Sequence, residues 1–246
     1  MKKTLLCLMF ITVTVINLSI AKSKKPFKNC SVKTPAVASL AYGIDISRYQ
    51  GDEMKFLDVK KDQLTFVICK ATQGSRHIDP EFAYNWKEIE KKGFIRGAYH
   101  FYTSADDPLK QAALFLKTVS SRLGTDFPLI VDVEGGGVPS KQSKSFVQNR
   151  LITFLKEIQK QTGRKPFIYT NNSTAKEYLQ NPVFASYPLW IANYNHIKQP
   201  QLPAAWNTKN WLLWQKSESY HEGSFIDDFD VFNGSADGLR AYISSH

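Results

Sequence analysis

The sequence predicts an α/β fold: an irregular, TIM-like β/α barrel with about eight strands and fewer than eight helices. Apolar, β-rich runs recur along the chain, helical patterns separate several of them, and those helical patterns fade after residue 187. Strands that alternate with helices form right-handed crossovers and a parallel sheet. A full eight-helix barrel takes about 250 residues, so the roughly 205 residues after residue 40 leave too little chain for eight helices.

Eight segments fit buried strands. Each is short, apolar and rich in β-branched or aromatic residues. In chain order they are Tyr42–Ser47, Leu64–Lys70, Ile95–Tyr102, Pro128–Glu134, Pro166–Thr170, Leu189–Tyr194, Trp211–Gln215 and Phe229–Phe232. In such a barrel the chemistry sits at the carboxyl ends of the strands, where Asp45, Lys70, Tyr102 and Glu134 fall.

Three segments between these strands predict helices. Apolar residues recur at three- and four-residue steps within 109–123 and within 147–158. A third candidate covers 80–92 and stops at Gly93, as the second stops at Gly163. The missing helices are expected among the last strands, which follow one another closely.

The N-terminus predicts export. Residues 1–21 combine a basic start, an apolar run and small residues before a cleavage point after Ala21, which is a signal-peptide layout. The apolar run is long, so an uncleaved N-terminal anchor is the alternative and would be the chain's membrane contact. Residues 22–40 read as a leader or linker, and residues 41–246 as one domain. The expected location is the periplasm, the cell envelope or the extracellular space, and the start of the chain looks bacterial.

The net charge indicates which binding partners suit the chain, and the cysteines indicate whether a disulfide can form. A formal net charge of +10, spread along the chain, suits adhesion to an anionic polymer such as a bacterial wall. An exported chain without a nucleic-acid-binding motif is not expected to bind nucleic acid. Cys30 and Cys69 allow a disulfide, but Cys69 lies in an apolar run and fits better as a small buried hydrophobe.

The segment Pro128–Glu134 ends in two carboxylates and is followed by three glycines. Alternation along a strand puts Asp132 and Glu134 on one face, with Cα atoms roughly 6.6 Å apart. Two acids this close cannot both ionise freely in a poorly solvated site, so one keeps a proton. That is the working state of a glycosidase acid and its partner, whereas two solvated acids at a strand end would have no such role. The glycines predict an open turn that gives a bulky glycan room to approach.

Four further segments accompany this pair: Tyr42–Gly51, Ile68–Gly74, Gly97–Tyr102 and Ile226–Gly234. In that order and spacing they resemble the glycoside hydrolase family 25, the lysozymes of the Chalaropsis type, and the resemblance covers roughly Ala41 to Tyr242. It implies an N-acetylmuramidase that cleaves the β-1,4 bond between N-acetylmuramic acid and N-acetylglucosamine in peptidoglycan. It also implies that residues 41–246 form the catalytic barrel.

The resemblance also implies roles for the acids. Glu134 becomes the general acid, and Asp132, Asp45 and Asp228 complete a ring of carboxylates. Asp227 is the off-by-one alternative to Asp228, and Asp230 falls where the family often has Asn.

Asp132 has three conceivable roles in glycoside cleavage. It could be a nucleophile, a base for water, or an orienter of the substrate's own 2-acetamido group. Its placement two residues before Glu134 motivates the hypothesis of a substrate-assisted, retaining reaction in which Asp132 steers the acetamido group.

Six residues near strand ends are candidates for substrate binding. The aromatic ones could stack on sugar faces or simply fill the barrel. They are Lys70, Tyr102, Tyr169, Trp190, Tyr194 and Trp214. His100 is expected to be a hydrogen-bonded interior residue. His77, His196 and His221 lack metal-ligand spacing, so no metal and no cofactor are expected. We expect a monomer that binds peptidoglycan glycan strands.

Two alternatives remain open at this level. A chitinase-like N-acetylglucosaminidase would need an Asp-x-x-Asp-x-Asp-x-Glu pattern, but Phe127 and Ile130 stand at its first two positions. A non-catalytic wall-binding module could share the barrel, because a fold does not prove a function. The presence of all four acids argues against such a module.

Overall fold

The computed structural model describes residues 39–246 except 52, 56, 59–62, 120–124, 140, 195–197, 210 and 223–224, together with the backbone but not the side chains of 220–222 and 225–227. The predicted signal peptide, nearly all of the 22–40 leader, Cys30, His196 and the side chains of His221 and Asp227 lie outside this description. The disulfide alternative therefore stays a prediction. Within the described part, no helix has both the length and the hydropathy that crossing a membrane requires.

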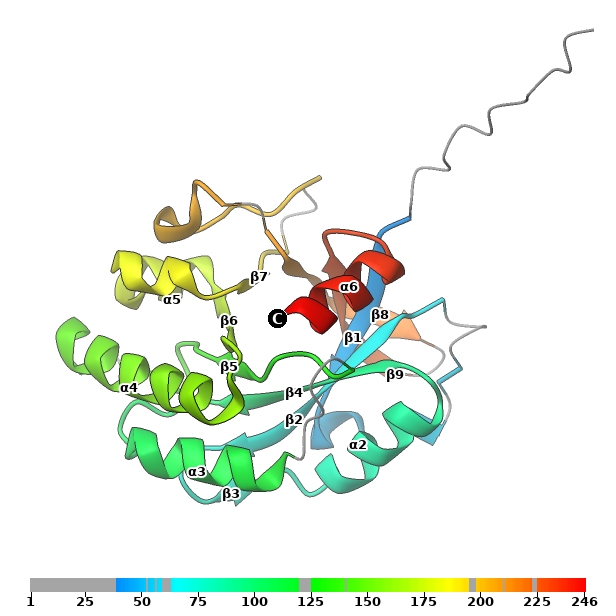
Figure 1. Ribbon diagram of the computed structural model, residues 1–246, viewed down its shortest axis with the longest axis horizontal. Helices are drawn as coiled ribbons and strands as arrows, with labels where there is room; N and C mark the ends of the chain where they lie inside the picture. The colour runs from blue at the N-terminus through cyan, green and yellow to red at the C-terminus, as the bar shows by residue number, and fades with distance from the viewer. Residues whose placement is uncertain are drawn as a thin grey trace, which may run out of the picture. The chain divides into compact units, whose positions relative to one another are not determined.

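The described residues form nine strands, and eight of them close into a barrel (Figure 1). The sheet order is β1-β9-β8-β7-β6-β5-β4-β2-β3, and a further pairing of β1 with β2 completes the ring. β3 is a short addition at the edge of β2. The strands are β1 (Ala41–Ile46), β2 (Phe66–Gln73), β3 (His77–Ile78), β4 (Ile95–Phe101), β5 (Ile130–Asp132), β6 (Phe167–Asn171), β7 (Leu189–Ala192), β8 (Leu213–Glu222) and β9 (Phe225–Phe232). The predicted eight-stranded barrel is confirmed.

The expectation of a purely parallel sheet is wrong at β9. This strand runs antiparallel to both β8 and β1. The sequence suggested two short late strands, but both extend toward each other and form a long hairpin. A parallel neighbour would need a crossover of a dozen or more residues, and the chain between β8 and β9 is too short to supply one.

Five helices lie within the described residues: α2 (Phe82–Lys91), α3 (Pro108–Thr118), α4 (Lys144–Thr162), α5 (Asn172–Tyr178) and α6 (Ala236–Ser245). The three expected helices are α2, α3 and α4. Gly163 ends α4 as predicted, and it does so in a left-handed conformation. α5 and α6 were not predicted. As expected, the described residues contain only a 3-10 turn, Ala204–Trp206, between β7 and β8. Further 3-10 turns cover Arg48–Gln50, Glu53–Lys55 and Pro182–Ser186.

Two apolar clusters build the domain. Outward-facing strand residues such as Val67 and Val131 belong to one cluster with helix residues such as Phe115 and Leu151. Inward-facing residues fill the barrel, and Leu239 and Ile243 of α6 join them. The inner cluster includes Ala41, Phe66, Ile68, Ile95, Phe127, Ile130, Phe167, Tyr169, Trp190, Ala192, Leu213 and Phe232. Because α6 packs on the first residues of parallel strands, it closes the N-terminal end and leaves the opposite end open.

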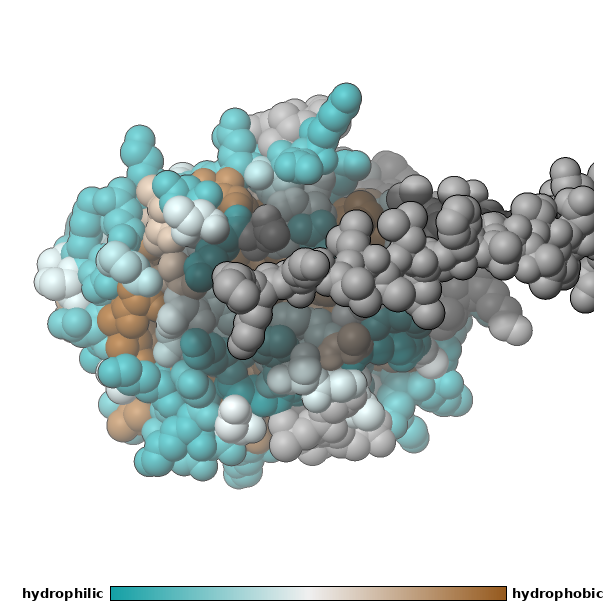
Figure 2. Space-filling model, turned by 45° about the horizontal axis from the view of Figure 1, so that its top comes forward, coloured by the Kyte–Doolittle hydropathy of each residue, from teal (hydrophilic) through white to brown (hydrophobic). Residues whose placement is uncertain are grey.

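The described surface carries mostly polar side chains on the face shown in Figure 2, and the hydrophobic patches of this face are separate from one another. Among the described residues, the exposed large hydrophobic side chains are Leu40, Tyr49, Ile78, Leu109 and Phe146. Tyr49 is the most exposed of these, at 78%.

Candidate active site

A cleft of about 450 Å³ opens at the carboxyl ends of the parallel strands, and five acids line it. Asp45 comes from β1, Asp132 from the end of β5, Glu134 from just beyond it, Asp228 from β9, and Glu218 from β8. The register pairs Asp45 with Asp228 across the antiparallel β1–β9 ladder. The structure therefore brings the four predicted carboxylates into one cleft.

Burial makes the central pair unusually reluctant to ionise. Asp132 is only 6% exposed, and desolvation, followed by the negative charge of Glu134, raises its pKa well above the ordinary value. Desolvation also raises the pKa of Glu134, although Lys70 opposes this. The pair therefore retains a proton at a pH where isolated carboxyls have lost theirs.

Lys70 is the sole lysine or arginine among the described residues that line the cleft. Its Nζ donates to Gln73 Oε1 at 2.8 Å and lies 4.8 Å from the centre of the Phe101 ring. Desolvation lowers the pKa of Lys70, while Asp132 raises it. One half-buried cation thus faces five acids, and it moderates their repulsion without cancelling it.

Gln215 of β8 organises one wall of the cleft. Its Nε2 donates to Asp45 Oδ2 at 2.7 Å, and its Oε1 accepts from the hydroxyl of Tyr169 at 2.8 Å. The hydroxyl of Tyr194 donates to the same oxygen. The two tyrosines fix the amide, and the amide fixes the direction of the Asp45 carboxyl.

The structure separates the predicted binding residues into two groups. Lys70, Tyr169, Trp190 and Tyr194 line the cleft. Tyr102 and Trp214 do not: Tyr102 is fully buried against Phe154 in the outer cluster, and the Trp214 indole donates to the carbonyl of Asn193. Both point away from the barrel interior because their positions have the outward parity of their strands.

Sequence reasoning missed several cleft residues. Tyr99 and Phe101 line the cleft, as do Gln215 and Glu218, and Tyr49 and Gln50 of the first 3-10 turn stand at its side. The period of two could have found Tyr99 and Phe101, because Gly97, Tyr99 and Phe101 share one face of β4. No local signal marks Tyr49, whose place depends on where the turn after β1 folds.

The glycines after Glu134 divide: Gly135 and Gly136 are exposed, as an open turn predicts, whereas Gly137 is buried and packed. A Cβ on Gly137 would lie 1.9 Å from the carbonyl oxygen of Tyr102, so only glycine allows this approach. The carbonyl of Gly137 accepts from the Ser104 N–H at 2.9 Å. The turn is packed against the end of β4 rather than left open at this point, and it fixes the backbone that carries Glu134.

Two interior residues behave as the sequence indicated. His100 is fully buried, its Nδ1 and Nε2 contact Thr72 Oγ1 and Gln111 Oε1, and burial lowers its pKa to about 4. Cys69 is fully buried in the outer apolar cluster. No group of three or more His, Cys, Asp or Glu side chains suited to a metal ion occurs in the described part of the chain.

Comparison with known proteins gives one consistent family. The model of the glycosyl hydrolases family 25 matches residues 44–224. YegX of Escherichia coli strain K12 is 34% identical over 227 residues, which cover 89% of this chain and 79% of that protein. Lysozyme M1 of Streptomyces globisporus is 30% identical over 227 residues, covering 86% of this chain and 74% of that protein.

Solved structures share the architecture. The crystal structure of a bacterial lysozyme from Streptomyces coelicolor superimposes with a TM-score of 0.76 and 29% identity. The superposition covers 84% of this chain and 98% of that chain.

Proposed function

This chain belongs to family 25 of the glycosyl hydrolases, and on that premise we propose that it is an exported N-acetylmuramidase with Glu134 as its general acid. The chain is a glycoside hydrolase of the lysozyme type that acts on peptidoglycan. The proposal adds two things to this statement. The bond that is cleaved is the β-1,4 linkage from N-acetylmuramic acid to N-acetylglucosamine, and the residues that catalyse the cleavage are the four predicted acids of the cleft. The observation that carries it is the cleft in which Asp45, Asp132, Glu134 and Asp228 meet.

Glu134 suits the role of proton donor. Glycoside cleavage passes through an oxocarbenium-like state, so protonating the leaving oxygen lowers the barrier. Desolvation raises the pKa of Glu134, which favours its protonated form relative to an exposed carboxyl, and Glu134 retains access to the cleft. Asp132 is more deeply buried and therefore suits a role that needs orientation rather than proton exchange with solvent.

Asp132 supports the substrate-assisted hypothesis. Its Oδ1 is buried and has no hydrogen-bond donor among the described residues. A buried acceptor without a donor is costly, and a substrate N–H would satisfy it. The substrate's 2-acetamido group offers such an N–H. By accepting from it, Asp132 would orient the carbonyl oxygen of the acetamido group toward the anomeric carbon. The product would keep its anomeric configuration; an inverted anomer in the first product seen by NMR would exclude this mechanism.

Peptidoglycan clearing tests the proposal. We expect Glu134→Gln to lower kcat by at least about 10³-fold, because the amide cannot supply a proton. Glu157→Gln makes the same chemical change on the exposed face of α4 and should clear peptidoglycan like the wild type. Equal, negligible clearing by the wild type and Glu134→Gln would favour a wall-binding module instead.

Mass spectrometry of the released fragments identifies the bond. Reducing-end muramic acid is expected. Reducing-end glucosamine would overturn the muramidase assignment in favour of an N-acetylglucosaminidase. The basic charge of the chain, the expected cleavage after Ala21 and the monomeric state belong to the same proposal, and fractionation of an expressing cell with N-terminal sequencing checks export.

A further inference from the structure

A sixth acid, Asp230, lies beneath the cleft. β9 points Asp228, Asp230 and Phe232 inward in turn. Asp228 lines the cleft, Phe232 belongs to the apolar filling of the barrel, and Asp230 lies between them with no exposed surface. This carboxyl therefore occupies the boundary between the reactive cleft and a dry core.

One of the two carboxyl oxygens of Asp230 has a hydrogen-bond donor among the described residues, and the other has none. Oδ1 accepts from the indole Nε1 of Trp190 at 2.9 Å. Oδ2 is buried and has no donor among the described residues. A buried, ionised carboxylate with one such oxygen would carry a large desolvation cost, which a proton on Oδ2 removes.

The neighbours of Asp230 supply an acceptor for that proton. Across the β1–β9 ladder Asp230 is opposite Gly43, which places it diagonal to Asp45 on the same inward face. Asp45 already accepts at Oδ2 from Gln215, and Gln215 is opposite Asp230 in the β8–β9 ladder. The carboxyls of Asp45 and Asp230 thus meet at a corner formed by β1, β8 and β9.

We propose that Asp230 is a positioning residue that stays protonated and donates a hydrogen bond to Asp45, so that Asp45 is held as a charged, oriented acceptor at the cleft. Gln215 then holds Asp45 from one side and Asp230 from below. The consequence for catalysis rests on the proposed function, because Asp45 is one of the acids of the muramidase cleft.

The electrostatic surroundings favour this protonation state. The charged groups that act on Asp230 are Asp45 on β1 and Asp228 on its own strand, and both are acids. Trp190 on β7 and Gln215 on β8 are neutral. Burial, these two acids and the hydrogen bond with Asp45 raise the pKa of Asp230 well above its ordinary value, and the Trp190 indole opposes them.

Two substitutions test the donor. Asp230→Asn keeps the shape, accepts from Trp190 and donates an amide N–H to Asp45, so kcat should stay within about threefold of the wild type. Asp230→Leu keeps a similar volume but donates nothing, so kcat should fall by about tenfold or more with a smaller change in KM. If Asp230 were ionised in the wild type, Asp230→Asn would remove a negative charge beneath the cleft and displace the pH profile of kcat/KM. A displaced profile with a large loss of kcat would overturn the proposal.

Infrared spectroscopy tests the proton without using activity. The Asp132–Glu134 pair contributes protonated-carboxyl absorption in both proteins, so the test is the difference spectrum at neutral pH, in which the wild type should show one protonated-carboxyl stretching band that Asp230→Asn lacks. An identical carboxyl region in the two proteins would overturn the proposal even if the muramidase activity is confirmed. Conversely, the band can be present when no activity is found, so failure of the proposed function and failure of this inference are distinguishable.

Discussion

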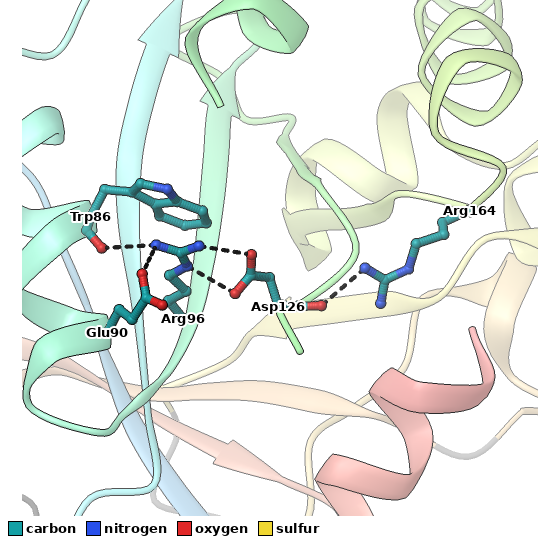
Figure 3. Close-up of polar contacts among 5 residues, drawn as sticks. All are labelled: Trp86, Glu90, Arg96, Asp126 and Arg164. Carbon is teal, nitrogen blue, oxygen red and sulfur yellow. Dashed lines mark hydrogen bonds and ion pairs between the residues drawn. The ribbon is translucent and has the colours of Figure 1, made fainter. Parts of the chain in front are cut away.

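The two ends of the barrel differ in the positive charge that lies beside their buried carboxyls. At the C-terminal end, Asp45, Asp132 and Asp230 are almost fully buried, and Lys70 is the one cation among the described cleft residues. At the N-terminal end, Asp126 is equally buried but lies against two arginines (Figure 3). Among the described residues, the buried carboxyls share a single lysine where the cleft opens, whereas an arginine neutralises the Asp126 carboxylate where the barrel closes.

The closed end is held by a bidentate ion pair. Arg96 Nε and Nη2 donate to the two carboxylate oxygens of Asp126 at 2.8 and 3.2 Å. Arg96 Nη1 also donates to Glu90 at 2.9 Å, and its guanidinium carbon lies 4.0 Å from the centre of the Trp86 ring. Figure 3 shows these side chains together. Every charge in this group therefore has a partner with good geometry.

Arg164 extends the network to α6. Its Nη1 donates to the carbonyl of Asp126 at 2.9 Å, and its Nη2 donates to the carbonyl of Ile243 at 3.2 Å. One guanidinium thus connects the loop before β5 with the helix that closes the barrel. The residues at this end hold elements together and have no access to the cleft.

The two ends differ in whether the free-energy cost of burying a carboxylate is compensated by a cation. A paired buried charge resists removal, because its partner would be left uncompensated. An unpaired buried acid raises its own pKa instead and becomes available for proton transfer. Substitutions of carboxyl by amide should therefore have opposite effects on stability at the two ends.

The largest effect is expected at the closed end. Asp126→Asn should destabilise the protein by about 3–5 kcal/mol, because Arg96 loses its carboxylate while staying buried. Urea unfolding measures this loss. Glu157→Gln is the matched control: its exposed pair with Lys160, at 3.9 Å, should contribute less than about 1 kcal/mol. Similar losses in the two variants would remove the distinction between the ends.

At the cleft the sign should reverse. Because the folded-state pKa of Asp132 is raised, folding takes up a proton, and wild-type stability falls as the pH rises through the window above 3.8. Asp132→Asn removes this penalty and should stabilise the protein at pH 7 by about 1 kcal/mol while reducing activity. The gain should fade as the pH is lowered toward 3.8. Thermal unfolding across pH measures both, and a loss of stability at pH 7 would contradict the comparison.

The smallest effect concerns Lys70. It lowers the pKa of both Glu134 and Asp132, so Lys70→Met should raise both and move the alkaline limb of the kcat/KM profile to higher pH. A loss of kcat of about threefold, or roughly 0.7 kcal/mol in the barrier, is expected, since Asp132 loses its nearby cation. Lys70→Arg keeps the cation and should keep the limb near its wild-type position. An unmoved limb in Lys70→Met would show that Glu134 does not govern it.

Much of the barrel could be predicted from local patterns. Apolar runs located the eight barrel strands, and Gly93 and Gly163 marked the ends of α2 and α4. The direction of β9 was missed because the two late strands were predicted too short, although Gly223 and Ser224, a two-residue hairpin signal, stand between β8 and β9 in the sequence. α5 and α6 were missed because α5 is short and α6 follows the last strand, where the crossover pattern gives no reason to expect a helix.

The residues of the site also divide into those that local patterns predict correctly and those that they do not. Asp132 and Glu134 are two residues apart, so the strand period alone places them together. Tyr102 and Trp214 were candidates because they stand near strand ends, but the outward parity of each position excludes them from the cleft. A place near a strand end is therefore not enough to bring a side chain into the cleft, because the facing direction of the position also matters.

By itself, the sequence determined the family, the strand count and the central pair of acids, because each depends on residues close together in the chain or on segments in a fixed order. Only the tertiary structure decided which acids are paired. Asp126 meets Arg96 across 30 residues, and Gln215 meets Asp45 across 170. Closure of the barrel fixes these encounters, and the resulting burial decides whether a carboxyl stabilises the fold or keeps a proton for the cleft.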